Sequence, residues 1–299
     1  DNKRMADRMK RWGAVAVEAM KQSGVSRLPE ISSVQGFADV LAMAAEEDGV
    51  HAHRIAEPAE VQGVNNRRHL AAVEAAWQER ARDALMDEGV TLRDPARTMI
   101  LGRVTPAADV VVEAGCQFEG QVVLGEGARI GPHCVLRNCR IGPGAVVEAH
   151  SHIDGAAVGP EAGVGPFARL RPETVLEQGA KVGNFVETKK AHLGPGVKAN
   201  HLSYVGDAEV GAGANLGAGT ITCNYDGHRK HGTTIGAGAF IGSAVQLVAP
   251  VSVGEGATIG AGSTITKDAP AHTLTLSRAK QVTIKDWKRP EQRAQEEQD

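Results

Sequence analysis

The residues of this chain whose types suit chemistry gather in one glycine-rich stretch, 201–227, which reads HLSYVGDAEVGAGANLGAGTITCNYDG. It begins with His201 and contains both tyrosines of the chain, Tyr204 and Tyr225. Histidine suits the role of a general base because it titrates near neutral pH. The stretch is therefore the first candidate for a site, and the glycines around these residues need an explanation.

One explanation of the glycines is a nucleotide-binding loop. The segment GAGANLG at 211–217 is one residue too long for the dinucleotide pattern G-x-G-x-x-G, and no segment matches the P-loop pattern G-x-x-x-x-G-K-[ST]. The strand-to-helix pattern that such loops require is also missing around it. We therefore do not expect these glycines to cradle a phosphate.

A second explanation is a metal site. The candidate ligands are histidines and cysteines upstream of the stretch: His133, Cys134, Cys139, His150 and His152. Their spacing fits no common zinc signature. The four cysteines of the chain also form no C-x-x-C pair, so we expect buried or free thiols rather than a metal centre or a disulfide framework.

A six-residue repeat explains the glycines better. From about Val111 onwards, aliphatic residues followed by glycine recur at a short period. A strict six-residue step links Ile235, Ile241, Leu247, Val253, Ile259 and Ile265. Such a repeat determines the architecture before any single helix or strand does.

The repeat predicts a coil with three flat sides, each made of a short strand and a turn. One aliphatic side chain in six points inward, the next residue is glycine because a Cβ would crowd the turn, and successive coils bury one another's faces. Steps of five residues, as from Val205 to Val210, indicate a register adjustment or a departing loop. Aromatic residues make up 3% of the chain, and we expect the interior to be too narrow for their rings.

The chain before the repeat has a different character. Its first 63 residues look helix-rich, and residues 66–87 predict one amphipathic helix with an apolar stripe made of Leu70, Val73, Trp77, Ala81 and Leu85. We interpret this helix as an arm between two domains, with an ordinary packed helix as the alternative. Beyond about residue 275 the repeat stops, and the end of the chain reads as a solvated tail.

Composition excludes several classes of function. The chain has 299 residues and a formal net charge of −3, so it lacks the overall basic field of a protein whose main partner is nucleic acid or an anionic membrane. No run approaches the roughly 20 apolar residues that cross a bilayer. The expected location is the cytoplasm.

The segments that do not follow the repeat indicate a family more specifically than the repeats do. These segments are GPFARLRP at 165–172, VGNFVETKKAHLGPG at 182–196, KANHLSYVGDAEVG at 198–211, GAGTITCNYDG at 217–227, IGSAVQLVAPV at 241–251 and SR at 277–278. Together they resemble the C-terminal half of the bifunctional bacterial enzymes that acetylate glucosamine-1-phosphate and then uridylylate the product. The resemblance covers nearly all of residues 60–290.

The resemblance implies a mainly β fold, a left-handed parallel β-helix of hexapeptide repeats, preceded by a long linker helix and a partial α/β nucleotidyltransferase-like segment. The implied domains are a nucleotidyltransferase remnant at 1–65, a linker with the long helix at 66–97, the β-helix acetyltransferase domain at 98–275 and a tail at 276–299. It also implies a homotrimer, with sites between subunits.

The family pattern assigns roles to single residues. It makes His201 the base that takes the proton of the sugar amine. At the phosphate of glucosamine-1-phosphate the pattern places Arg171 and Lys189, with Lys190 or Lys230 as additions. At the sugar it places Tyr204 and Asn215. Glu187 would orient the base or a cation. Residues that would line acetyl-CoA are Ala218, Asn224, Tyr225, Ser243 and Ala261, with Arg278 at its phosphates and the Ala218 N–H as an oxyanion donor.

The chain departs from the family pattern at its start. The glycine-rich GxGTRM-type loop that holds UTP is absent from this sequence, and Asn65, a remnant magnesium ligand, is left without its partner aspartate. Mg²⁺ belongs to the uridylyltransferase half alone, so we do not expect uridylyl transfer from this chain by itself. Two alternatives stay open, namely a non-catalytic hexapeptide-repeat scaffold and a remnant that still binds UDP-sugar.

Overall fold

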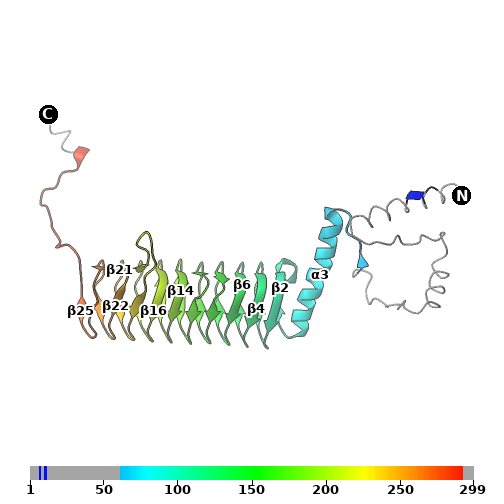
Figure 1. Ribbon diagram of the computed structural model, residues 1–299, viewed down its shortest axis with the longest axis horizontal. Coiled ribbons are helices and arrows are strands. Elements are labelled where there is room, and N and C mark those ends of the chain that lie inside the picture. Colours follow the sequence, from blue (N-terminus) through cyan, green and yellow to red (C-terminus); the bar gives the residue numbers. More distant parts are fainter. Residues whose placement is uncertain (1–6, 8–9, 12–60, 292–299) are drawn as a thin grey trace, which may run out of the picture. The chain divides into compact units, whose positions relative to one another are not determined.

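A computed structural model describes residues 7, 10–11 and 61–291 (Figure 1). The chain divides into two units, 1–62 and 63–299, and almost all of the described residues belong to the second. The predicted nucleotidyltransferase remnant at 1–65 therefore lies outside the described residues, apart from 7, 10–11 and 61–65. The account below concerns the second unit.

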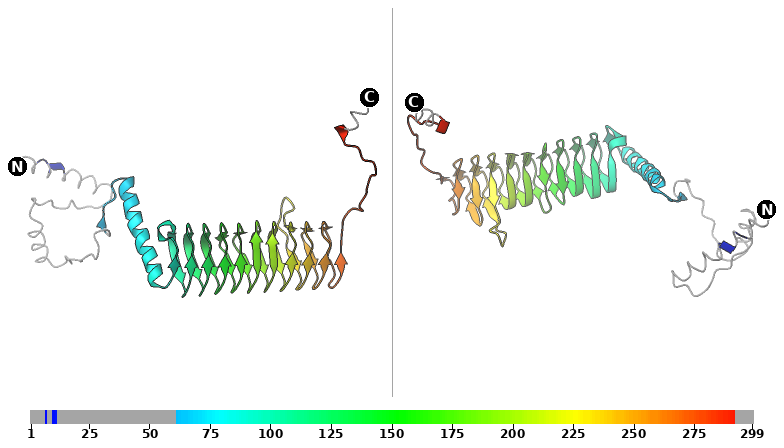
Figure 2. Two further views of the ribbon diagram at one scale, coloured as in Figure 1. Left: turned by 180° about the vertical axis from the view of Figure 1, so that it is seen from behind. Right: turned by 90° about the horizontal axis from the view of Figure 1, so that it is seen from above.

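The second unit is a stack of short parallel strands, with successive coils side by side in both views of Figure 2. Its strands among the described residues are β1 (Thr91–Leu92), β2 (Met99–Pro106), β3 (Val111–Val112), β4 (Gln117–Leu124), β5 (Arg129–Ile130), β6 (Val135–Ile141), β7 (Val146–Val147), β8 (His152–Asp154), β9 (Ala157–Val158), β10 (Gly163–Val164), β11 (Arg169–Leu170), β12 (Val175–Leu176), β13 (Lys181–Asn184), β14 (Glu187–Leu193), β15 (Lys198–His201), β16 (Tyr204–Val210), β17 (Asn215–Leu216), β18 (Ile221–Cys223), β19 (Thr233–Ile235), β20 (Phe240–Ile241), β21 (Gln246–Val248), β22 (Val251–Val253), β23 (Thr258–Ile259), β24 (Thr264–Ile265) and β25 (Leu274–Thr275).

These strands form three faces. One face is an 11-stranded sheet that runs from β1 to β25 through β15 and β17. The other two faces belong to one 14-stranded sheet, because long strands such as β14 and β16 continue around the corner between them. Mainly β structure in a parallel β-helix of hexapeptide repeats, as predicted, is confirmed. The left-handed sense stays a prediction.

The six-residue rhythm corresponds to one inward side chain per face. In the strict run, Ile235 lies in β19, Ile241 in β20 and Leu247 in β21, and all three are buried. The five-residue step from Val205 to Val210 falls within β16, which turns the corner without a loop. At that corner Asp207 has φ of 47°, in the left-handed region, and this tightens the turn by one residue.

At several corners the next coil requires the glycine that follows an inward aliphatic residue. A Cβ on Gly242 would lie 2.5 Å from the backbone N of Ala261, and one on Gly217 would lie 2.6 Å from the backbone N of Ser243. The predicted crowding is therefore real, and its source is the backbone of the neighbouring coil.

The expectation about aromatic rings was wrong at one position. Phe118, in β4, is fully buried within the core of aliphatic side chains. Phe167, Phe185 and Phe240 are exposed. The interior of this coil thus accommodates a ring, although small branched side chains fill most of the other described coils.

The predicted helix is α3 (Arg67–Asp87), and it lies against the first coil. Asn66 caps its N-terminus by accepting a hydrogen bond from the His69 backbone N–H at 3.0 Å. Gln78 is buried and makes two 2.9 Å hydrogen bonds to the backbone of Ile100 in β2, one as donor and one as acceptor. Among the described strands β2 pairs with β4 alone, so Gln78 satisfies backbone groups at the open end of the sheet.

The ends of the stack differ slightly from the predicted domain limits. The first coil begins with β1, which pairs with β3 and lies within the range predicted as linker. Residues 276–291 form no strand and are exposed. Within the described residues no helix is both long and apolar enough to cross a membrane.

The cysteines behave as predicted. All four are free thiols; Cys116, Cys134 and Cys139 are buried, and Cys223 is partly exposed. Burial raises the pKa of Cys116 to about 11 and the pKa of Cys134 to about 12. These two thiols therefore stay protonated at neutral pH.

Candidate functional site

The predicted base, His201, ends strand β15 and is exposed. Its backbone pairs in parallel register with Asn184 at the end of β13. The side chains of these two residues meet, with Asn184 Oδ1 lying 2.6 Å from His201 Nδ1. The sequence interpretation did not include Asn184.

His201 belongs to a ladder of residues that occupy one position in successive coils: Asn184, His201, Ala218, Ser243 and Ala261. Asn184 and His201 end β13 and β15, and the register of β15, β17, β20 and β23, continued two residues past Leu216, Ile241 and Ile259, aligns the other three with them. Their backbones follow one pattern. The carbonyls of Asn184, His201, Ala218 and Ser243 accept hydrogen bonds from the N–H groups of Leu202, Gly219, Ala244 and Gly262, at 3.0, 3.4, 2.7 and 2.8 Å.

This ladder joins the predicted base to three of the predicted acetyl-CoA residues. Buried Ser203 adds a second connection, because its hydroxyl donates to the carbonyls of His201 at 2.8 Å and Gly217 at 3.4 Å. At the far end of the ladder, Arg278 Nη1 donates to the carbonyl of Ala261 at 3.2 Å. Ala218, Ser243 and Ala261 have small side chains, and Ser243 and Ala261 are exposed.

Tyr204 and Asn224 lie together over Gly206 on the adjoining face. Asn224 is buried, and its Nδ2 is 2.5 Å from Asp207 Oδ2 and 3.4 Å from Tyr204 Oη. A Cβ on Gly206 would lie 2.5 Å from Tyr204 Oη and 2.7 Å from Asn224 Nδ2. The absence of a side chain at Gly206 therefore creates the space that these two groups use.

A loop that follows β18 carries Tyr225 and Lys230. These two residues form an antiparallel bridge, and Lys230 Nζ lies 4.7 Å from the centroid of the Tyr225 ring. Lys230 Nζ also donates to Asn224 Oδ1 at 3.4 Å. The loop thus holds one cation close to Tyr204 and Asn224.

Asp226 organises the same loop. Its Oδ1 accepts hydrogen bonds from the backbone N–H groups of Arg229 at 2.6 Å and His228 at 2.7 Å, and its Oδ2 lies 2.7 Å from His231 Nε2. The bond from Arg229, followed by those from His231 and His228, holds the pKa of Asp226 well below its usual range. Asp226 therefore stays ionised as the anchor of the turn.

A column of charged side chains runs along the face that carries Tyr204. Arg137 is paired with Glu119 on one side and lies 3.9 Å from Asp154 on the other. Arg171, in a later coil, donates to Glu187 Oε1 at 2.8 Å. Glu187 is thus in contact with a cation, and its role in a site stays a prediction.

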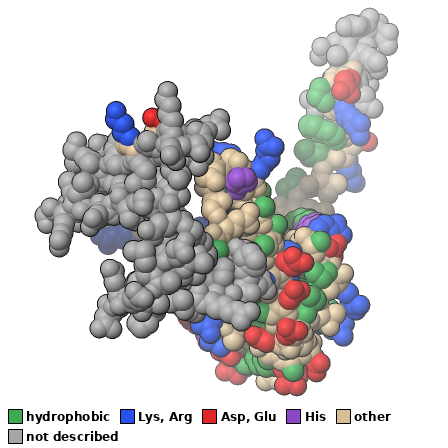
Figure 3. Space-filling view, turned by 90° about the vertical axis from the view of Figure 1, so that its right-hand side faces the viewer, with side chains coloured by type: hydrophobic (Ala, Val, Ile, Leu, Met, Phe, Trp, Pro, Cys, Tyr) green, Lys and Arg blue, Asp and Glu red, His purple; other side chains and the backbone are tan. Residues whose placement is uncertain are grey.

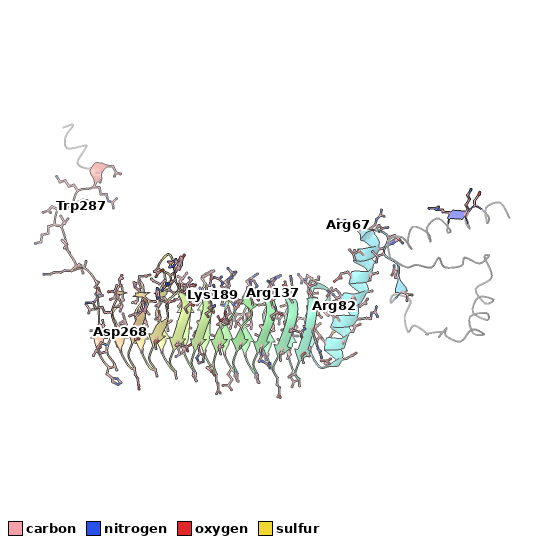
Figure 4. All side chains as sticks on the ribbon, in the orientation of Figure 1. Arg67, Arg82, Arg137, Lys189, Asp268 and Trp287 are labelled. Atoms are coloured by element: carbon pink, nitrogen blue, oxygen red, sulfur yellow. The ribbon has the colours of Figure 1, made fainter. Side chains whose placement is uncertain are left out.

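Lys189 ends this column, and its backbone pairs with Gly206. Figure 4 labels Lys189 and Arg137 along the same edge of the stack. Across the described ranges of the chain, no ion pair involves Lys189. Lys190, by contrast, lies at a left-handed corner with φ of 47° and pairs with Glu173 at 3.2 Å, so its charge is already partnered.

Two predicted residues stand apart from this cluster. Asn215 lies in β17 on the 11-stranded face, in register with Lys198 and Phe240, and within the described residues its side chain makes no hydrogen bond to the cluster. Asn65 lies at the other end of the unit, just before the cap of α3.

The described residues do not form a metal site. They contain no group of three or more histidines, cysteines or carboxylates arranged to hold a metal ion, at Asn65 or elsewhere. The rings of His133 and His150 instead stack at 5.1 Å, in a row continued by Phe167 and Phe185.

The surface seen from the α3 end mixes acidic and basic side chains (Figure 3).

Comparison with known families agrees with this architecture. Residues 232–267 match the bacterial transferase hexapeptide family, and residues 100–195 match the C-terminal domain of GMPPB. The fold and these matches define a hexapeptide-repeat β-helix protein of the transferase type. The chain is 59% identical over 257 residues to the bifunctional protein GlmU of Alkalilimnicola ehrlichii, and 50% identical over 289 residues to that of Methylococcus capsulatus. Over the region that it shares with them, the chain is a GlmU-like protein.

The chain spans part of the length of these relatives. The two alignments cover 85% and 95% of this chain, but 55% and 63% of the relatives. Residues 1–82 also match a family described as an RNA methyltransferase domain. The alignment with the Methylococcus protein extends over most of those same residues.

Solved structures of similar type include UDP-N-acetylglucosamine acyltransferases. The one from Campylobacter jejuni is 15% identical, has a TM-score of 0.38 and covers 62% of this chain and 71% of its own. The one from Francisella novicida is 15% identical, has a TM-score of 0.36 and covers 62% of this chain and 66% of its own.

Proposed function

We propose that this chain transfers the acetyl group of acetyl-CoA to the amine of glucosamine-1-phosphate, giving N-acetylglucosamine-1-phosphate. The observation that carries the proposal is the ladder that places His201 beside Ala218, with Ser243 and Ala261 following in the next coils. The high identity to proteins named GlmU supports the same activity. The product would serve the synthesis of UDP-N-acetylglucosamine and of cell-wall precursors.

Acetyl-CoA supplies an acetyl group on a thioester, and transfer forms an amide bond while the carbon–sulfur bond breaks and the thiol leaves. In this chain His201 takes the proton that the attacking amine loses. The residue after Ala218 is Gly219, whose N–H donates to the His201 carbonyl. The backbone N–H of Ala218 donates to the carbonyl oxygen of the thioester, on which negative charge develops.

The sugar phosphate requires cations. Lys189, with no ion pair among the described residues, supplies a mobile point charge, and Arg171, held by Glu187, supplies a planar fork. Lys230 adds a third cation from the loop beside Asn224. Tyr204 and Asn215 hold the sugar, and this assignment of Asn215 rests on the family resemblance.

The acetyl-CoA site follows the ladder. Small residues Ala218, Ser243 and Ala261 expose backbone groups along its length, while Asn224 and Tyr225 approach from the loop. Arg278, which contacts the Ala261 carbonyl, lies where it could meet the phosphates of the cofactor. The row of small side chains, with Arg278 bound at its end, supports the assignment.

Further proposals extend beyond the described unit. We propose a homotrimer, since flat solenoid sides favour packing between copies, and a cytoplasmic location. We propose that the chain has four parts, at 1–65, 66–97, 98–275 and 276–299. The first paired strand of the β-helix, β1, lies within the second part. The described residues contain no group of three or more His, Cys, Asp or Glu side chains that could hold a metal ion, and no step is assigned to Mg²⁺. We propose uridylyltransferase activity only for an intact enzyme, as the family resemblance implies, and not for this chain by itself.

Release of thiol from acetyl-CoA tests the proposal. Rates would be compared with glucosamine-1-phosphate, glucosamine-6-phosphate and serine as acceptors at equal concentration. We expect turnover with the first acceptor and little with the others, because the phosphate must reach Lys189 while the amine reaches His201. Equal rates on all three would reject this substrate, and no release with any of them would favour a non-catalytic scaffold.

A further inference from the structure

The contact between Asn184 and His201 bears on which ring nitrogen of the imidazole carries the proton. The distance between Asn184 Oδ1 and His201 Nδ1 is 2.6 Å, which is hydrogen-bond distance. An amide oxygen accepts hydrogen bonds and cannot donate them. With the amide oxygen toward the ring, this hydrogen bond forms only in the tautomer that carries the proton on Nδ1 and has a free lone pair on Nε2.

Hydrogen bonds also hold the backbone of His201. Its carbonyl accepts from Ser203 Oγ at 2.8 Å and from the Gly219 N–H at 3.4 Å. Asn184 and His201 are each followed by a residue in the left-handed region, Phe185 with φ of 56° and Leu202 with φ of 48°. The two coils thus make the same turn directly after the pair, which keeps Asn184 and His201 aligned.

We propose that Asn184 is a positioning residue, which holds His201 in the Nδ1–H tautomer and directs Nε2 toward the amine of the substrate. The role of Nε2 toward the substrate amine rests on the proposed acetyl transfer, whereas the tautomer rests on the contact with Asn184 alone. Glu187, the orienting residue expected from the family pattern, is bound to Arg171 and is not a hydrogen-bond partner of His201.

The partner of His201 is a neutral amide, not a carboxylate. Its oxygen can orient the ring without adding a negative charge beside it. The charged side chains on β13 and β15 are Lys181 and Lys198, each three residues from the pair, and β17 on the other side contributes none.

The tautomer can be measured in the wild-type chain by the ¹⁵N chemical shifts of its histidine rings, with the His201 signals assigned by their loss in His201→Gln. We expect Nδ1 of His201 to be protonated. A wild-type His201 protonated on Nε2 and bare on Nδ1 would overturn the proposal without any variant at Asn184.

Two variants at Asn184 extend the test to activity, with Asn200→Ala, one residue before His201 on β15, as the matched control. Asn184→Ala should lower kcat for thiol release at least tenfold, leave KM for glucosamine-1-phosphate nearly unchanged, and mix the His201 tautomers. Asn184→Asp should retain the tautomer and move the rising limb of the pH–rate profile upward by about one unit. Asn200→Ala should do neither.

The outcomes separate the two proposals. If wild-type chain releases no thiol, acetyl transfer fails while the ¹⁵N shifts still decide the role of Asn184. If the wild type is active and Asn184→Ala keeps its kcat, pH profile and tautomer, Asn184 does not position the base. Thermal unfolding of each variant shows whether a loss of activity comes from a loss of folding. If Asn184→Ala does not fold, the pH profile of Asn184→Asp and the ¹⁵N spectrum of the wild type decide the role of Asn184.

Discussion

The amide of Asn224 is held by the carboxylate of Asp207, with Nδ2 and Oδ2 only 2.5 Å apart and the two residues one coil apart in the chain. This contact fixes which end of the amide faces which neighbour. Nδ2 faces Asp207 and Tyr204, and Oδ1 faces Lys230 at 3.4 Å. Asp207 thereby connects the corner of one coil to the loop that carries Tyr225 and Lys230.

Removal of the Asp207 carboxylate should weaken acetyl-CoA binding. Because Asp207 has φ of 47°, Asp207→Gly deletes the acceptor without backbone strain, whereas Asp207→Asn keeps an oxygen at the same place. We expect the glycine variant to raise KM for acetyl-CoA by about tenfold, since an unsatisfied buried amide costs about 1–3 kcal/mol. The asparagine variant should keep most of the wild-type affinity. Equal KM values in both variants and wild type would show that Asn224 needs no such anchor.

Substitution at Gly206 should damage the site more than the fold. A Cβ there would meet Tyr204 Oη at 2.5 Å and Asn224 Nδ2 at 2.7 Å, both on side chains that can move. Gly206→Ala should therefore displace these groups, lower kcat/KM at least tenfold, and change the free energy of unfolding by about 1 kcal/mol or less. Gly163→Ala is the control, because its Cβ would find only Lys181 Cγ at 3.8 Å. A fully active Gly206→Ala would remove Tyr204 and Asn224 from the site.

The contact between α3 and the first coil predicts a stability effect. Gln78→Ala would leave the N–H and the carbonyl of Ile100 without their side-chain partner at a buried position. We expect the free energy of unfolding to fall by about 2–4 kcal/mol, and amide exchange at Ile100 to accelerate. Gln178→Ala, which removes an exposed and longer hydrogen bond to Glu161, should change stability by less than about 0.5 kcal/mol. Similar unfolding curves for the two variants would mean that α3 does not cap the sheet.

His192 gives the fold a pH dependence of predictable sign. Its ring nitrogens lie 3.0 Å from Glu177 and 3.0 Å from Glu209, in the preceding and following coils. The hydrogen bond with Glu177 and then that with Glu209 raise the pKa of His192 in the folded state. A raised pKa means that the stabilisation is fully present below the unfolded value near 6.5 and is lost as the pH rises through the folded value.

The comparison for this prediction is wild type against His192→Gln. The difference in Tm should be larger at pH 6 than at pH 8.5 and should shrink in high salt, because the three side chains are partly solvated. A difference that grows with pH would contradict the assignment of charge to this cluster.

The repeat was predictable from sequence because each inward position allows few side chains. The run from Ile235 to Ile265 places one buried aliphatic residue on each face in turn. The geometry of the corner between Val205 and Val210 could not be predicted from this repeat. The five-residue step there requires Asp207 to adopt a left-handed backbone conformation, which a six-residue period does not indicate. The burial of Phe118 was likewise not predicted, because it depends on how one coil packs on the next.

The site was predicted in part. The family pattern supplied His201, Lys189 and Asn224, but it missed Asn184 and Asp207, the residues that hold His201 and Asn224. Both missed residues lie 17 positions before their partners, which is the length of one coil. A search for polar residues one coil away from each candidate would have found them, once the coil length had been read from the repeat. The separation of Asn215 from the cluster could not be read in this way, because it depends on which face each strand occupies.

The rate of thiol release from acetyl-CoA in the presence of glucosamine-1-phosphate, measured for wild type and His201→Ala at matched folding, tests the account most directly. If His201 is the base, the substitution should lower kcat by about 10²–10⁴-fold, the usual contribution of general base catalysis, with little change in Tm because His201 is exposed. An active wild type whose rate survives His201→Ala would contradict the account.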